Sequence, residues 1–130
     1  MPWYALQEAV EAAKGRRILF IDTCHSQGAY NERLGNTAYY ANILAYSSAR
    51  WDQEALERPD LGHGLFTYAV VEGIAGKAAR RDRGGPITTL ALRDFLVARV
   101  AELAGKLGHQ QEPQYFRGRD AMDYVLVGAR

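Results

Sequence analysis

The apolar positions near the start of the chain predict a helix followed by a buried strand. Apolar residues recur there every three or four positions, at Trp3, Leu6, Val10 and Ala13, and this spacing is typical of an amphipathic helix. Gly15 is expected to end this helix. The continuous run Arg-Ile-Leu-Phe-Ile at 17–21 is rich in strand formers and is typical of a central strand buried on both faces. It gives way at once to a polar stretch, residues 22–28.

The middle of the chain predicts one more strand and then a helix. Residues 29–41 show no clear period and contain two asparagines and a glycine, which favours a loop. Residues 43–46 indicate a second, shorter strand, and the polar stretch 47–60 that follows is expected to be irregular. A broad apolar stripe then predicts a helix from Leu65 that ends near Gly73 or Gly76.

The last third of the chain predicts a charged loop over residues 77–86, a long helix and two short strands. Thr88 or Thr89 is expected to cap the helix, and Gly108 suits its end. The expected buried face of this helix comprises Leu92, Phe95, Leu96, Val100, Leu103 and Leu107. Residues 115–116 and 124–127 are expected to be strands.

This order of elements predicts one α/β domain over residues 1–130, a sheet with helices on its faces. In such folds, ligands bind at the carboxyl ends of the strands. The polar stretch 22–28 follows the most apolar strand and therefore marks the expected site.

Composition narrows the possible functions. The chain is 48% hydrophobic and 24% charged, and 16 Lys and Arg against 15 Asp and Glu leave a net charge of +1. This balance offers no electrostatic case for binding nucleic acid or an anionic membrane. One cysteine excludes an internal disulfide, and no apolar run reaches membrane-spanning length, so a cytoplasmic location is expected. The cysteine and three scattered histidines lack zinc-ligand spacing, and no cofactor is indicated.

Cys24 is the candidate nucleophile. A lone cysteine is most often a buried structural residue. Cys24, however, follows a strand and lies between polar residues, a setting that presents a thiol to solvent. The alternative, an unrelated α/β domain with a structural cysteine, stays open.

The residues around Cys24 resemble the cysteine motif of metacaspases and their bacterial relatives in the caspase-like peptidase family. The segment reads Asp22-Thr23-Cys24-His25-Ser26-Gln27-Gly28, with glutamine where many relatives have glycine. The similarity to that family extends to four further segments, at 45–49, 62–69, 87–88 and 111–113. The resemblance therefore runs from about Lys14 onward. It implies a three-layer α/β/α sandwich, of which this chain lacks the first strands.

The resemblance further implies thiolate attack on a peptide bond, with the backbone N–H of Cys24 in the oxyanion hole. The family histidine lies about 50 residues before the cysteine. No histidine occurs among the 23 residues before Cys24. We therefore expect the chain to begin inside the fold, to be inactive alone, and to risk self-association through an exposed sheet edge. A non-catalytic regulatory or interaction domain is the alternative.

The three histidines of the chain fit other roles. His25 adjoins the cysteine too closely to turn back onto its thiol. His63 lies in Gly-His-Gly, which copies the surroundings of the family histidine, but it precedes a helix and follows the nucleophile, as in a non-catalytic family segment. His109 is expected to be solvated at a helix end.

The expected partner is a peptide or protein substrate. Asp22 precedes Cys24 by two residues on an extended strand, so both side chains face the same way. By resemblance, Asp22 lines the pocket for a substrate Arg or Lys; the alternative is a local hydrogen bond to backbone. Ser47 and Ser48 belong to the segment that resembles the substrate groove. Trp51 is expected either to wall that groove or to pack in the core.

Overall fold

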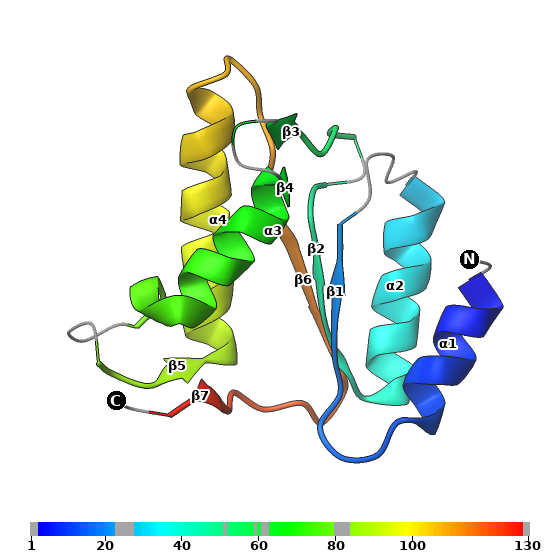
Figure 1. Cartoon of the computed structure of the whole chain (residues 1–130). Helices are drawn as coiled ribbons and strands as arrows, with labels where there is room; N and C mark the ends of the chain where they lie inside the picture. The colour runs from blue at the N-terminus through cyan, green and yellow to red at the C-terminus, as the bar shows by residue number, and fades with distance from the viewer. Residues whose placement is uncertain are drawn as a thin grey trace.

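A three-stranded sheet forms the centre of the protein. The computed structural model describes residues 3–22, 28–50, 52–58, 60, 63–79 and 84–128. The sheet has the order β1 (Ile18–Ile21), β2 (Leu44–Ser47) and β6 (Gln114–Arg117). Strand β1 runs parallel to β2, and β6 runs antiparallel to β2. Helices cover both faces, so the predicted α/β architecture is confirmed (Figure 1).

Helices α1 (Trp3–Ala12) and α2 (Gly28–Ala41) cover one face of the sheet (Figure 1). A core cluster lies beneath them, made of Ile21, Leu34, Ala38, Ile43 and Ala45. Arg17, just before β1, ties both helices to the sheet. Its guanidinium donates to the carbonyls of Val10, at 3.2 Å, and Ala41. Because the carboxyl end of a helix carries free carbonyls and partial negative charge, one cation here stabilises two helix ends.

The prediction of a loop at 29–41 is wrong, because α2 occupies this segment. Its buried residues Leu34 and Ala38 are 0% exposed, and the ring of Phe116 lies 3.4 Å from the position a Cβ would take on Gly35. Asparagine and glycine weaken a helix by a few tenths to about 1 kcal/mol each. Packing against the sheet outweighs that cost, and Asn42, at φ 55°, ends the helix in the left-handed conformation.

The other face is covered by α3 (Leu65–Glu72), the wider π-turn η2 (Gly73–Lys77) and α4 (Thr89–Gly105). Its core centres on Tyr46, whose hydroxyl donates to the Thr89 carbonyl at 2.7 Å. Burial raises the pKa of Tyr46. Thr88 caps α4 as predicted, since its hydroxyl accepts from the Ala91 N–H at 3.1 Å. Leu107, predicted on the buried face, is instead 48% exposed because α4 has already ended.

Two small ribbons complete the fold. Strands β3 (Glu57–Arg58) and β4 (His63–Gly64) pair antiparallel and lead into α3. Strands β5 (Ile87–Thr88) and β7 (Val125–Val127) pair antiparallel below α3 and α4 (Figure 1). Within the described part of the chain, no helix combines the length and apolar character needed to cross a bilayer.

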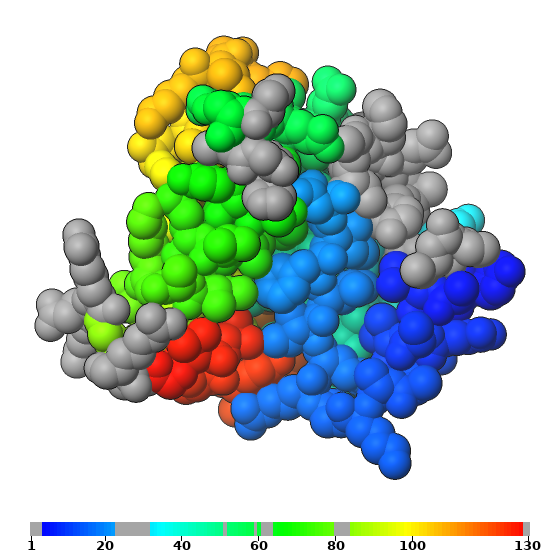
Figure 2. All heavy atoms as spheres, viewed as in Figure 1, coloured from blue at the N-terminus to red at the C-terminus, as the bar shows by residue number. Residues whose placement is uncertain are grey.

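The outer edge of β1 has no strand partner among the described residues. On the face shown in Figure 2, residues of β1 reach the surface between α1 and α3. Phe20 is 38% exposed, and its ring stacks on the ring of Tyr46 at a centroid distance of 4.9 Å. Such an edge offers free backbone N–H and C=O groups to a further strand.

An ion-pair cluster joins α3 to α4. Arg99 donates to both carboxylate oxygens of Glu72, at 2.7 and 3.2 Å, and Lys77 donates to the same carboxylate. The Glu72 side chain is only 9% exposed. The Arg99 hydrogen bonds, with help from Lys77, lower the pKa of Glu72 to about 2. Folding therefore favours the ionised carboxylate.

Glu72→Gln is expected to lower the free energy of unfolding at pH 7 by about 2 kcal/mol, the scale of a hydrogen bond to a charged group. A depressed folded-state pKa gives stability that is full above the unfolded value near 4.5 and disappears as the pH falls toward 2. The variant and the parent should thus converge in acid. Urea denaturation between pH 7 and pH 2.5 measures this difference. Glu102→Gln is the matched control, since Glu102 pairs with the same arginine but is 54% exposed; an equal loss there would contradict the prediction.

Candidate functional site

Asp22 lies at the carboxyl end of β1 and against the first turn of α3. Its Oδ2 accepts a hydrogen bond from Thr67 Oγ1 at 2.5 Å. Gly64, the residue before α3, approaches so closely that a Cβ there would lie 2.8 Å from the same oxygen. Gly64 is the N-cap residue of α3 and has no side chain with which to cap the helix. The Asp22 carboxylate therefore faces the positive end of the α3 dipole.

The carboxyl ends of β1 and β2 meet at this position. Ile21 pairs with Ser47, and the Ser48 N–H donates to the Ile21 carbonyl at 2.9 Å. The structure thus brings Asp22 and the segment of Ser47 and Ser48 together, as expected for neighbouring parallel strands. Cys24 and Trp51 lie outside the described residues, so their predicted roles stay predictions.

Ser47 and Ser48 are both 0% exposed. Ser47 Oγ donates to the Ala49 carbonyl at 3.5 Å, and the Ser48 carbonyl accepts from a glutamine side chain at 2.9 Å. A substrate-binding role for these residues stays a prediction. The Ser48 N–H and C=O are already hydrogen-bonded within the domain, so neither of these backbone groups nor a buried hydroxyl faces a substrate peptide in the described structure.

Gln111 is a site residue that sequence reasoning did not single out. It is 2% exposed, and its amide bridges two segments that are far apart in sequence. Its Nε2 donates to the Ser48 carbonyl and its Oε1 accepts from the Leu56 N–H, each at 2.9 Å. Gln111 therefore fixes the chain that leaves β2 to the chain that enters α3. The resemblance of segment 111–113 to the family was the available signal in the sequence, but only the fold identifies the partners of the Gln111 amide.

Gln111→Ala is expected to lower the free energy of unfolding by about 2–3 kcal/mol, because both bonded backbone groups would stay buried without partners. Thermal or urea unfolding measures the loss. The neighbouring residue Gln110 is exposed, so Gln110→Ala should change stability by less than about 0.5 kcal/mol. Equal stabilities for the two variants would refute the role assigned to the Gln111 amide.

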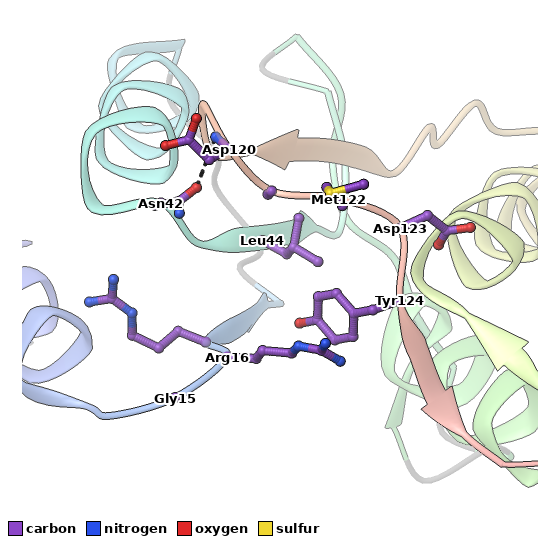
Figure 3. A pocket seen from close by; sticks show the side chains of 10 residues that line it. Gly15, Arg16, Asn42, Leu44, Asp120, Met122, Asp123 and Tyr124 are labelled. Atoms are coloured by element: carbon purple, nitrogen blue, oxygen red, sulfur yellow. Dashed lines mark hydrogen bonds between the residues drawn. The ribbon is translucent and has the colours of Figure 1, made fainter.

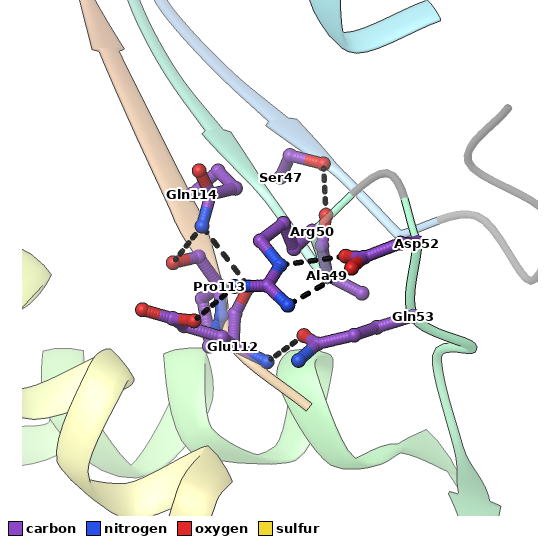
Figure 4. A network of polar contacts seen from close by, with 8 residues as sticks. All are labelled: Ser47, Ala49, Arg50, Asp52, Gln53, Glu112, Pro113 and Gln114. Carbon is purple, nitrogen blue, oxygen red and sulfur yellow. Dashed lines mark hydrogen bonds and ion pairs between the residues drawn. The ribbon is translucent and has the colours of Figure 1, made fainter. Parts of the chain in front are cut away.

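A polar network follows β2 beyond the serines. The Arg50 guanidinium lies between two carboxylates, 2.6 Å from Asp52 and 3.7 Å from Glu112 (Figure 4). Its hydrogen bonds hold the pKa of Asp52 below the usual range. Gln53 Oε1 accepts from the Glu112 N–H at 2.7 Å. The segment after β2 is therefore tied to residues 111–112 by several side chains.

A cavity of about 550 Å³ opens beside this network, between α4 and the segment 109–112. Polar side chains line one part of it and α4 the other; the lining includes Arg50, Gln53, Val97, Ala101, His109 and Glu112. Its position borders the segment assigned to the substrate groove by resemblance. The cavity could accommodate an extended peptide segment of mixed character.

The structure describes two of the three histidines, His63 and His109. His109, expected to be solvated, is half-buried, and its Nε2 lies 3.3 Å from the Glu54 carbonyl. The backbone of His63 lies in β4, next to the glycine that touches Asp22. His25 lies outside the described residues. Among the described residues, no three His, Cys, Asp or Glu side chains gather where they could hold a metal ion.

A second cavity, of about 430 Å³, lies at the other end of the sheet. It is lined by Leu44, which begins β2, and by residues 120–124, whereas Asp22 lies where β1 ends (Figure 3). The Arg16 guanidinium stacks over the Tyr124 ring at 4.4 Å from its centroid. The Tyr124 hydroxyl is buried and has no hydrogen-bond partner within the described part of the chain. Because it opens away from the Asp22 end, this cavity has no part in chemistry there.

Comparison with known proteins adds no relative to this description. No family model matches the chain, and no curated protein and no solved structure matches it either.

Proposed function

We propose that this domain is the nucleophile-bearing part of a caspase-like cysteine endopeptidase that cleaves after Arg or Lys. The single observation that carries the proposal is the geometry of Asp22. Its carboxylate is fixed at the carboxyl end of β1, two residues before the candidate nucleophile and against the start of α3. A fixed, exposed carboxylate is suited to a charge-assisted hydrogen bond with a substrate guanidinium or ammonium.

In the proposed reaction the Cys24 thiolate attacks the carbonyl carbon of the basic residue, and backbone N–H groups, including that of Cys24, bind the oxyanion. The C–N bond then breaks as a protonated histidine donates its proton to the leaving amine. Water hydrolyses the resulting thioester and releases the thiol. The histidine is proposed to lie on a strand that pairs with the outer edge of β1, which has no strand partner among the residues that the structure describes.

The proposal is tested on the full product of the gene that encodes this chain, using fluorogenic peptides that differ only in having Arg, Lys, Leu or Asp before the cleaved bond. We expect cleavage after Arg and Lys and little after Asp. Labelling with an arginyl chloromethyl ketone should add one mass increment on the peptide that contains Cys24. Calcium is included in one arm of the assay.

The same assay separates the alternatives. A folded protein that cleaves none of the four peptides, with or without calcium, and that is not labelled at Cys24 would contradict the proposal. That result would favour a non-catalytic caspase-like domain if Cys24 still reacts with iodoacetamide. An unreactive thiol would favour a structural cysteine.

A further inference from the structure

We infer that Thr67 is a specificity-determining positioning residue, which holds the Asp22 carboxylate so that one oxygen faces the substrate. This inference rests on the proposed function. It goes further because it assigns a role to a residue that lies 45 positions away from Asp22 in the chain and outside the cysteine motif.

The contact between the two side chains is short and directional. Thr67 Oγ1 donates to Asp22 Oδ2 at 2.5 Å, within the usual range for a hydroxyl bound to a carboxylate. Such a bond removes rotational freedom about the terminal torsion of aspartate, which is otherwise broad. The carboxylate plane is therefore set by the position of Thr67.

Gly64 closes the same side of the carboxylate. The position of a Cβ on this residue would lie 2.8 Å from Asp22 Oδ2 but 3.5 Å from Oδ1. Real side chains essentially never approach so closely, so any larger residue at 64 would push the carboxylate away. The Thr67 hydrogen bond and the close approach of Gly64 thus both fall on Oδ2, and among the described residues no hydrogen bond is made to Oδ1.

The element that carries Thr67 is itself well anchored. Its neighbours in α3, Leu65 and Phe66, are 0% and 1% exposed, and the Leu65 N–H donates to the Leu56 carbonyl at 2.9 Å. Thr67 is therefore held by a packed helix instead of a loop. Positioning groups on such elements hold geometry more closely than groups on loops do.

The consequence concerns how a basic side chain is bound. With Oδ2 bonded to Thr67 and enclosed by Gly64, the carboxylate offers mainly Oδ1, which suits a single N–H donor. A lysine ammonium supplies such a donor, whereas the guanidinium fork of arginine binds best to two free oxygens. The site should therefore cleave after Lys and Arg with kcat/KM values within about tenfold of each other.

The test compares Thr67→Val, which keeps the shape but removes the hydroxyl, with Thr67→Ser, which keeps the hydroxyl. In the full gene product, Thr67→Val should lower kcat/KM by about tenfold for Arg and Lys peptides, the scale of one hydrogen bond, through KM more than kcat. It should leave the Leu peptide unchanged. Thr67→Ser should behave like the parent, and Gly64→Ala should reproduce the loss seen in Thr67→Val. If Thr67→Val fails to fold, as judged by circular dichroism, Thr67→Ala replaces it.

The outcomes are distinct. An equal fall for all three peptides would assign Thr67 a purely structural role and overturn the inference, as would unchanged kinetics in folded Thr67→Val. A parent protein that cleaves no basic substrate would instead refute the proposed function, before any variant is compared. Selective loss on basic substrates with rescue by serine supports the inference.

Discussion

Cys24→Ala is expected to abolish cleavage after Arg and Lys, with a fall in kcat of at least about 10³-fold, because loss of a nucleophile removes the covalent route altogether. The effect should fall on kcat with little change in substrate binding, since the pocket carboxylate is retained. Fluorogenic Arg and Lys peptides measure the rate, and titration with a peptide that ends in an arginine amide, which forms no bond to the thiol, measures occupancy of the pocket.

Cys24 is the one cysteine of the chain, so thiol labelling of this domain reports on a single position. The matched control is Asp120→Asn, an exposed substitution at the far end of the sheet, which should keep parental activity. Retention of more than about a tenth of the parental kcat in folded Cys24→Ala would exclude Cys24 as the nucleophile.

Asp22→Asn is expected to lower kcat/KM for Arg and Lys peptides by about 10²-fold, because it removes the negative charge while keeping the size of the side chain. A peptide with Leu before the cleaved bond should lose less than about threefold. The ratio of the two kcat/KM values is the measurement of interest, since it cancels any general loss of active protein.

Asp60→Asn is the control for Asp22→Asn. Asp60 is also exposed, but it is bonded to Arg58 nearby in the chain and does not lie at the end of β1. Equal ratios for Arg and Leu peptides in Asp22→Asn and the parent would remove Asp22 from the specificity pocket. Such a result would leave the nucleophile untouched, because Cys24→Ala tests it separately.

Several elements could be predicted because their signals are local. The continuous apolar run at 18–21 forms β1, and Thr88 caps α4, since strand propensity and capping depend on residues close in sequence. Helix α2 could not be predicted this way. Its asparagines and glycine disfavour a helix, and only burial of Leu34 and Ala38 against the sheet stabilises it.

The candidate site also has a part that the sequence predicts and a part that only the fold determines. The residues of the cysteine motif and the candidacy of Asp22 follow from the sequence, because chemical type and spacing along one strand are local properties. The partners of that site, Thr67, Gly64 and Gln111, come from segments more than 40 residues distant, and no spacing rule relates them. The contacts of Thr67 and Gly64 exist because α3 packs at the end of the strand that leads to Asp22, and those of Gln111 because the chain after α4 passes beside the end of β2. The sequence alone therefore determines which chemical groups the candidate site contains. The orientation of the Asp22 carboxylate depends instead on long-range packing that brings separate elements together.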